Sequence, residues 1–142
     1  MKAVDTNVLI YAIDATVRAK HERAIGLMHD WRQAVDRPVL PWQVACEYLA
    51  YLHRQQSQLR FAHTRVGEEF QNLIDHFRLI LPEDDLLRIS MQLFDRHSLS
   101  HWDSLLLAAC ISAGVDTLYS EDMSHGVTYD SVTVINPFHD QK

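Results

Sequence analysis

The chain has 142 residues, 47% of them hydrophobic and 23% charged, and its formal net charge is −6 at pH 7. This length fits one domain with a substantial core, so residues 1–142 are expected to form a single domain. The excess of acids argues against a protein that binds nucleic acid through its overall field. The chain also shows no secretory signal and no apolar stretch of membrane-spanning length, so a soluble cytoplasmic protein with no membrane association is expected.

The first half of the chain predicts strands that alternate with helices. Apolar residues at helical spacing alternate with short apolar runs that suit buried strands. Strands are expected at residues 3–4 and 39–40, and helices at residues 8–13, 17–35, 41–52 and 60–76. The polar residues 55–59 are expected to connect the last two helices.

The second half continues the same alternation. Strands are expected at residues 77–81, 115–119 and 132–135. Helices are expected at residues 86–94 and from a cap at Ser100 to residue 113, with residues 105–113 as the most apolar part. The last of these helices is apolar on nearly every side, which is typical of a helix inside a core. Short apolar strands separated by helices favour parallel pairing with right-handed crossovers. The predicted fold is therefore α/β, with three α/β/α layers and a central parallel sheet of about five short strands.

Two features outside the predicted strand ends bear on function. Cys46 and Cys110 lie in apolar helical stretches without metal-type spacing, so both are expected to be buried structural thiols. Residues 48–67 contain no acid but carry Arg54, Arg60 and Arg65. This stretch predicts either a basic surface for RNA phosphates or a solvated helix face, and charge alone does not separate the two.

Asp5 follows the first predicted strand, at the point where the backbone must change from strand to helix. Ligands of α/β sheets bind in the crevice beyond the carboxyl ends of the strands. A carboxylate there can cap the following helix or bind a metal ion, and Thr6 and Asn7 can hydrogen-bond beside it. Taken alone, Asp5-Thr6-Asn7 favours the helix cap.

Further acids occupy positions of the same kind. Glu47 lies at the margin of an apolar helix face, where an unpaired charge would be costly. Asp103 begins the most apolar helix, and Glu121-Asp122 follow the strand at residues 115–119. Each has a structural interpretation by itself: an edge acid, a capping box with Ser100, and a polar turn.

Acids gathered at one sheet edge would require cations. Neighbouring carboxylates repel one another and raise each other's pKa, so such a cluster is stable near neutral pH only with positive charge nearby. Oxygen ligands of this kind suit Mg²⁺, with Mn²⁺ as a substitute. A zinc site is disfavoured because His97 and His101, spaced i, i+4, lack a third ligand nearby.

Four motifs in this order resemble the PIN domain family, and within it the VapC-type toxins. They are the strand into Asp5-Thr6-Asn7, Glu47 within Val44-Ala45-Cys46-Glu47-Tyr48, the helix start Trp102-Asp103-Ser104-Leu105-Leu106-Leu107-Ala108-Ala109, and Leu118-Tyr119-Ser120-Glu121-Asp122-Met123 followed by Asn136-Pro137-Phe138. By this likeness the metal-binding and catalytic acids, here called the four acids, are Asp5, Glu47, Asp103 and Asp122. The residues that would support them are Thr6, Asn7 and Ser120. The family's hydroxyl-x-Asp pattern matches Ser120-Glu121-Asp122, which favours Asp122 over Glu121.

The resemblance implies a Mg²⁺-dependent ribonuclease that hydrolyses RNA phosphodiester bonds. A VapC-type toxin would also have a cognate antitoxin that covers its active site, and would form a homodimer. An inactive PIN-like scaffold that binds RNA or protein is the alternative. A phosphoenzyme of the receiver or haloacid-dehalogenase type is disfavoured, because position 7 is Asn rather than Asp and no Lys follows a late strand.

Overall fold

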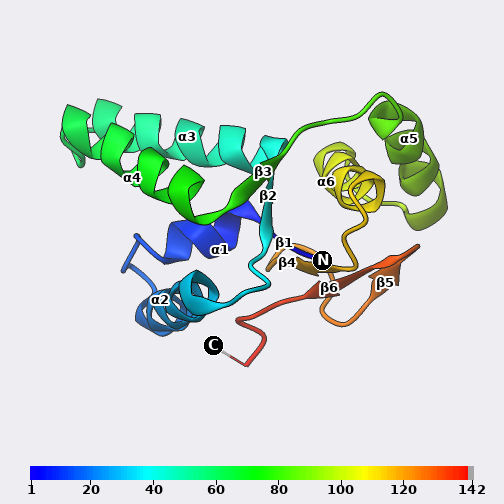
Figure 1. The fold of residues 1–142 in the computed structure, drawn as a ribbon, viewed down its shortest axis with the longest axis horizontal. Coiled ribbons are helices and arrows are strands. Elements are labelled where there is room, and N and C mark those ends of the chain that lie inside the picture. The colour runs from blue at the N-terminus through cyan, green and yellow to red at the C-terminus, as the bar shows by residue number, and fades with distance from the viewer. Residues whose placement is uncertain (141–142) are drawn as a thin grey trace.

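A six-stranded sheet with the strand order β3-β2-β1-β4-β6-β5 forms the centre of the molecule. The structure is a computed structural model and describes residues 1–140. The strands are β1 (Lys2–Val4), β2 (Val39–Pro41), β3 (Arg78–Ile80), β4 (Thr117–Tyr119), β5 (Thr128–Tyr129) and β6 (Val132–Ile135). The helices are α1 (Thr6–Tyr11), α2 (Arg18–Gln33), α3 (Trp42–Ser57), α4 (His63–His76), α5 (Leu86–His97) and α6 (His101–Ser112). In the view of Figure 1, α1 to α4 lie to one side of the strands, and α5 and α6 lie to the other.

The predicted fold class is confirmed, with one strand more than expected. β1, β2, β3, β4 and β6 pair in parallel, whereas β5 pairs antiparallel with β6. A tight turn joins these last two strands, and Asp130 in it has a positive φ of 55°. The two residues of β5 are too few to form an apolar run that would predict a strand.

The core lies around the middle strands and α6. Val4, Leu40 and Leu118 of three neighbouring strands are fully buried, as are Leu107 and Cys110 of α6. The prediction that this helix is enclosed is therefore confirmed. Among the described residues, no helix combines the length and the apolar character needed to cross a bilayer.

Several sequence-based boundaries and one burial prediction are wrong. The first helix begins at Thr6, two positions early, because Asp5 caps it. α3 continues to Ser57 through the predicted connection, and the turn after it contains Leu59 at a positive φ of 59°. Cys46 is exposed, since the buried face of α3 runs through other positions, whereas Cys110 is buried as predicted.

Candidate active site

The ends of β1 and β4 bring two acidic segments together. The two strands are parallel neighbours, with Val4 opposite Tyr119, so the residues that follow them emerge at the same edge. The backbone N–H of Asp5 donates to the Tyr119 carbonyl at 2.9 Å. The Ser120 hydroxyl donates to Asp5 Oδ2 at 2.7 Å, and both side chains are buried.

Asp5 is the buried centre of the site. Its Oδ1 accepts a hydrogen bond from the Thr6 backbone N–H at 2.7 Å, so the carboxylate caps α1 while Ser120 holds its other oxygen. Only 4% of the residue is exposed, and this burial raises the pKa of Asp5 from 3.8 to about 6. The two hydrogen bonds oppose the rise, and repulsion from Asp122 and Glu47 adds to it. The helix-cap interpretation is therefore confirmed by the hydrogen bond to Thr6. Burial also makes the charged form of the same carboxylate less favourable.

Glu47 extends from α3 toward the start of α1. Its Oε2 accepts a hydrogen bond from the Thr6 hydroxyl at 2.7 Å. Its Oε1 accepts one from the Gln43 amide at 3.0 Å, and the same amide donates to the Trp102 carbonyl at 3.2 Å. Thr6 and Gln43 thus tie Glu47 to both α1 and α6.

Asp103 and Asp122 complete the set of the four acids. Asp103 lies in the first turn of α6, where its backbone N–H donates to the Ser100 hydroxyl at 3.1 Å, so the predicted cap is confirmed. Burial raises the pKa of Asp122, and repulsion from Asp103, Glu121 and Glu47 raises it further. Two of the other predicted acids, Asp103 and Glu47, therefore help to raise the pKa of Asp122, and Asp122 and Glu47 help to raise that of Asp5. The structure therefore brings the four acids toward one edge of the sheet, with Glu121 also near Asp122.

The predicted supporting residues all contact this group. Besides holding Asp5, the Ser120 hydroxyl accepts a hydrogen bond from the Asp122 backbone N–H at 3.1 Å. Asn7 Oδ1 accepts one from the Glu121 backbone N–H at 3.3 Å. The Asn7 amide lies near enough to Asp122 to lower its pKa, but its buried Nδ2 makes no hydrogen bond of normal geometry.

Glu121 is held by side chains outside the four acids, although it lies near Asp122. Its carboxylate pairs with Lys20 Nζ of α2 at 2.5 Å and accepts a hydrogen bond from the Tyr11 hydroxyl at 2.8 Å. Sequence reasoning did not identify Lys20 or Tyr11, because this ion pair joins residues 101 positions apart. Gln43 was also missed, although its i, i+4 spacing to Glu47 was a usable signal.

The carboxylate oxygens of the four acids are suitable ligands for a hard divalent cation. All four predicted ligands are carboxylates, and the raised pKa of Asp5 marks a charge that a nearby cation would stabilise. In the part of the chain that the structure describes, no three His, Cys, Asp or Glu side chains already lie close enough together to hold one ion. Side-chain movement would therefore have to accompany metal binding by several of these acids.

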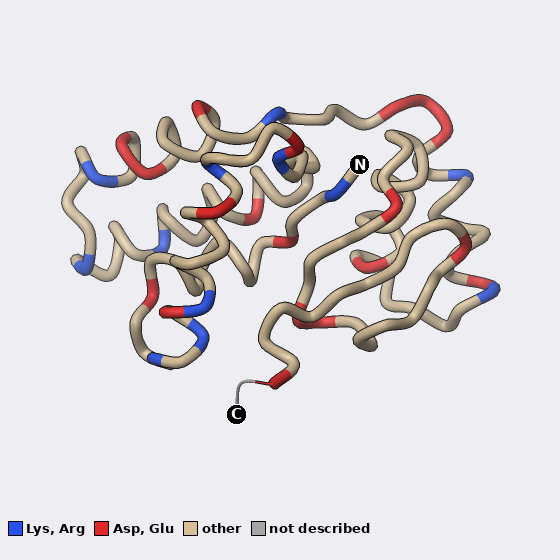
Figure 2. The backbone as a smooth tube through the Cα atoms, turned by 60° about the horizontal axis from the view of Figure 1, so that its bottom comes forward, with Lys and Arg blue, Asp and Glu red and all other residues tan. Residues whose placement is uncertain are grey.

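A shallow depression of about 320 Å³ opens beside the acids and is bordered by Thr6, Asn7, Glu47, Arg54 and Asp122. Of the three predicted RNA-binding arginines, the structure brings Arg54 to this depression. Arg60 lies in the turn before α4. Arg65 of α4 places its Cζ 3.8 Å from the centroid of the Phe61 ring, and its Nε lies 3.5 Å from Glu69 Oε1. Most Lys and Arg do lie on the side of the molecule that holds α1 to α4 (Figure 2).

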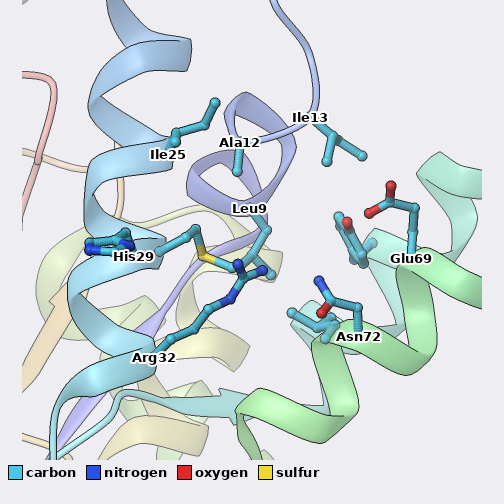
Figure 3. A pocket seen from close by; sticks show the side chains of 11 residues that line it. Leu9, Ala12, Ile13, Ile25, His29, Arg32, Glu69 and Asn72 are labelled. Carbon is cyan, nitrogen blue, oxygen red and sulfur yellow. The ribbon is translucent and has the colours of Figure 1, made fainter.

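A second cavity, of about 250 Å³, lies between α2 and α4 and contains none of the four acids. His29 and Arg32 of α2 face Glu69 and Asn72 of α4 across its mouth, and Leu9 of α1 lies between the two helices (Figure 3). Its mixed lining does not resemble a cation site.

Comparison with known proteins agrees with this architecture. Residues 2–126 match the family model described as PIN domain. VapC20 of Mycobacterium tuberculosis, described as a toxin that cleaves the sarcin-ricin loop, has a similar structure with a TM-score of 0.62 and 20% sequence identity, over 86% of this chain and 90% of that chain. PAE2754 from Pyrobaculum aerophilum has a TM-score of 0.57 and 15% identity, over 94% of this chain and 83% of that chain. No curated protein sequence matches the chain.

Proposed function

The chain belongs to the PIN domain family, and on that premise we propose that it is a Mg²⁺-dependent ribonuclease. The observation that supports the proposal is geometric: Thr6 hydrogen-bonds both Asp5 and Glu47, Ser120 joins Asp5 to the backbone of Asp122, and Glu47 and Asp122 border one depression. Such a group is stable near neutral pH when a cation is bound, and Mg²⁺ and Mn²⁺ are the ions that prefer these ligands.

In this proposal the four acids would hold the cation, and the RNA would bind in the depression that Glu47 and Asp122 border. A divalent cation held by the acids would supply a water of lowered pKa and positive charge that offsets the negative charge of the phosphodiester. Ser120 and Thr6 fix the Asp5 carboxylate, while Thr6 and Gln43 fix Glu47. No side chain of the protein has to act as the nucleophile.

We further propose that the protein is a VapC-type toxin of the cytoplasm, a homodimer that a cognate antitoxin neutralises. The fold likeness to VapC20 supports this proposal, as do the ordered sequence motifs. The RNA backbone would approach past Arg54, which borders the depression beside the acids. Arg60, between α3 and α4, and Arg65, in the first turn of α4, would extend this contact. Transient expression, followed by sequencing of RNA ends, tests the cellular role: growth arrest and new ends are expected with the wild type and not with Asp5→Asn.

The enzymatic test uses purified protein, single-stranded RNA and Mg²⁺. The wild type should cut the RNA, and neither Asp5→Asn nor Asp103→Asn should do so. Glu121→Gln is the matched control, because this acid is paired with Lys20. Equal cutting by the wild type and both active-site variants would indicate a contaminating nuclease and contradict the proposal.

A catalytically inactive scaffold is the second candidate. One observation favours it: within the described residues, no three acids are already arranged to hold an ion. Calorimetric titration with Mg²⁺ separates the two candidates. RNA binding without Mg²⁺ binding or cleavage would support the scaffold, whereas binding that Asp5→Asn abolishes would support the nuclease.

A further inference from the structure

A narrow apolar cleft lies between the first turn of α3, the end of β3 and helix α6. Its volume is about 110 Å³, and it is lined by Trp42 and Trp102 together with Ile80, Pro82 and Leu105, among others. Half of Trp42 and 63% of Trp102 are exposed, although large aromatic side chains are usually well buried. No Asp, Glu, Lys or Arg is among the described residues that line the cleft.

Gln43 connects this cleft to the acids. It lines the cleft, and its amide donates both to Glu47 Oε1 and to the Trp102 carbonyl. Trp102 directly precedes Asp103, and the His101 ring packs edge-on against its indole with 4.6 Å between the ring centroids. Gln43 therefore lies between the cleft and Glu47, so a ligand bound at Glu47 could extend past Gln43 into the cleft.

We propose that this cleft binds one unstacked base of the RNA substrate, next to the phosphate that is cut; this inference rests on the proposed ribonuclease function. A nucleobase is flat and uncharged, and indoles are good stacking partners for bases of single-stranded RNA. A cleft without charged side chains suits the base, whereas the phosphate requires the cation at the acids. Gln43 Oε1 accepts no hydrogen bond from the described residues and is placed to accept one from a base N–H.

A second copy of the chain is the competing occupant. It would be expected to cover the stripe on α5 formed by Leu87, Met91 and Phe94, which are 66%, 69% and 51% exposed. These three residues line a different, wider hollow of about 430 Å³ that does not include either indole. The narrow cleft and its hydrogen-bonded link to Glu47 favour the base.

The test combines protein variants with RNA lacking single bases. Trp42→Ala and Trp102→Ala should each weaken binding and cleavage of an oligoribonucleotide at least about fivefold, the loss expected for one aromatic–base stack. Trp42→Phe and Trp102→Phe should retain most of the affinity, since they keep an aromatic face. Phe94→Ala is the matched control, because it removes an exposed aromatic side chain outside the cleft, and it should leave RNA affinity unchanged.

An abasic nucleotide is then placed in turn at each position of the oligonucleotide, and affinity is measured by fluorescence anisotropy. One position near the cut should weaken binding to the wild type, and the same position should cause no added loss in the Trp→Ala variants. The abasic series uses the wild type and the Phe variants if an Ala variant does not fold.

Equal affinity of the wild type for all abasic positions would overturn the proposal, as would Trp→Ala variants that bind and cut normally. A change of oligomeric state in the Trp→Ala variants, seen by light scattering, would instead assign the cleft to a second copy. If the wild type binds RNA but cuts none, the proposed function fails, while the abasic series still decides what the cleft binds.

Discussion

The ends of β1 and β4 occupy equivalent places in the sheet and present their acids in opposite ways. A helix begins immediately after β1, so Asp5 is buried and both its oxygens accept hydrogen bonds. No helix follows β4 directly, and Asp122 is exposed while Glu121 pairs with Lys20. One strand end therefore holds a carboxylate buried between two hydrogen-bond donors, and the neighbouring end presents a more exposed carboxylate.

In the proposed cation site, the buried Asp5 and the exposed Asp122 would therefore have different roles. A buried acid with a raised pKa gives a fixed point whose repulsion a cation relieves. A more exposed acid such as Asp122 would then have to approach the ion by side-chain rotation, because no three ligands are already close enough among the described residues. Substitution of Asp5, after β1, should therefore lower activity more than substitution of either acid after β4.

Removing the charge of Asp5 should have the largest effect. We expect Asp5→Asn to lower kcat/KM for RNA by at least about a hundredfold, since several kcal/mol of charge stabilisation depends on the cation. Mg²⁺ should raise the Tm of the wild type and not that of the variant, as measured by differential scanning fluorimetry. An active Asp5→Asn variant with an unchanged response to Mg²⁺ would contradict the assignment of Asp5 as the fixed ligand.

The two acids after β4 should differ from each other. Asp122→Asn is expected to reduce kcat/KM at least about tenfold, because it removes one cation ligand. Glu121→Gln should change kcat/KM by less than about twofold and cost at most about 1 kcal/mol of stability through its partly exposed pair with Lys20. The reverse order of the two activities would show that Glu121, rather than Asp122, serves the cation.

Burial of Asp5 should also appear in the pH dependence of stability. Because its folded-state pKa of about 6 exceeds the ordinary 3.8, the folded protein binds more protons between these values. Its contribution to the free energy of unfolding therefore falls as pH rises from about 4 to about 6, by about 3 kcal/mol in total, and is constant above. Urea denaturation of wild type and Asp5→Asn in EDTA isolates this contribution.

In that comparison, the variant should be the more stable protein at pH 7, and the difference should shrink toward pH 4. A constant difference across this range would show that Asp5 does not carry the titration.

The sequence was sufficient to predict that Asp5 and Asp122 follow strand ends at one edge of the sheet, because parallel strands end together. The burial of α6 was predictable because residues 105–113 are apolar on nearly every side. The catalytic and metal-binding roles of the four acids stay predictions. β5 was not predictable, since a strand of two residues has no recognisable pattern. The exposure of Cys46 was not predictable either, because the buried side of α3 depends on its tertiary contacts. The pair between Lys20 and Glu121 likewise depends on how α2 packs, which no local spacing encodes.

The smallest effect that we predict concerns the connection between the β1 end and α3. Thr6→Val keeps the shape of the side chain but removes the hydroxyl that donates to Glu47 Oε2. Hydrogen bonds to charged groups contribute about 1.5–3 kcal/mol, and Glu47 keeps its bond to Gln43, so we expect a loss of stability near the lower value. Activity should fall several-fold, because Glu47 is less well oriented, and Thr6→Ser, which retains the hydroxyl, should restore it. If Thr6→Ser were as impaired as Thr6→Val, the methyl group rather than the hydroxyl would be important, and Glu47 would not depend on the β1 end for its position.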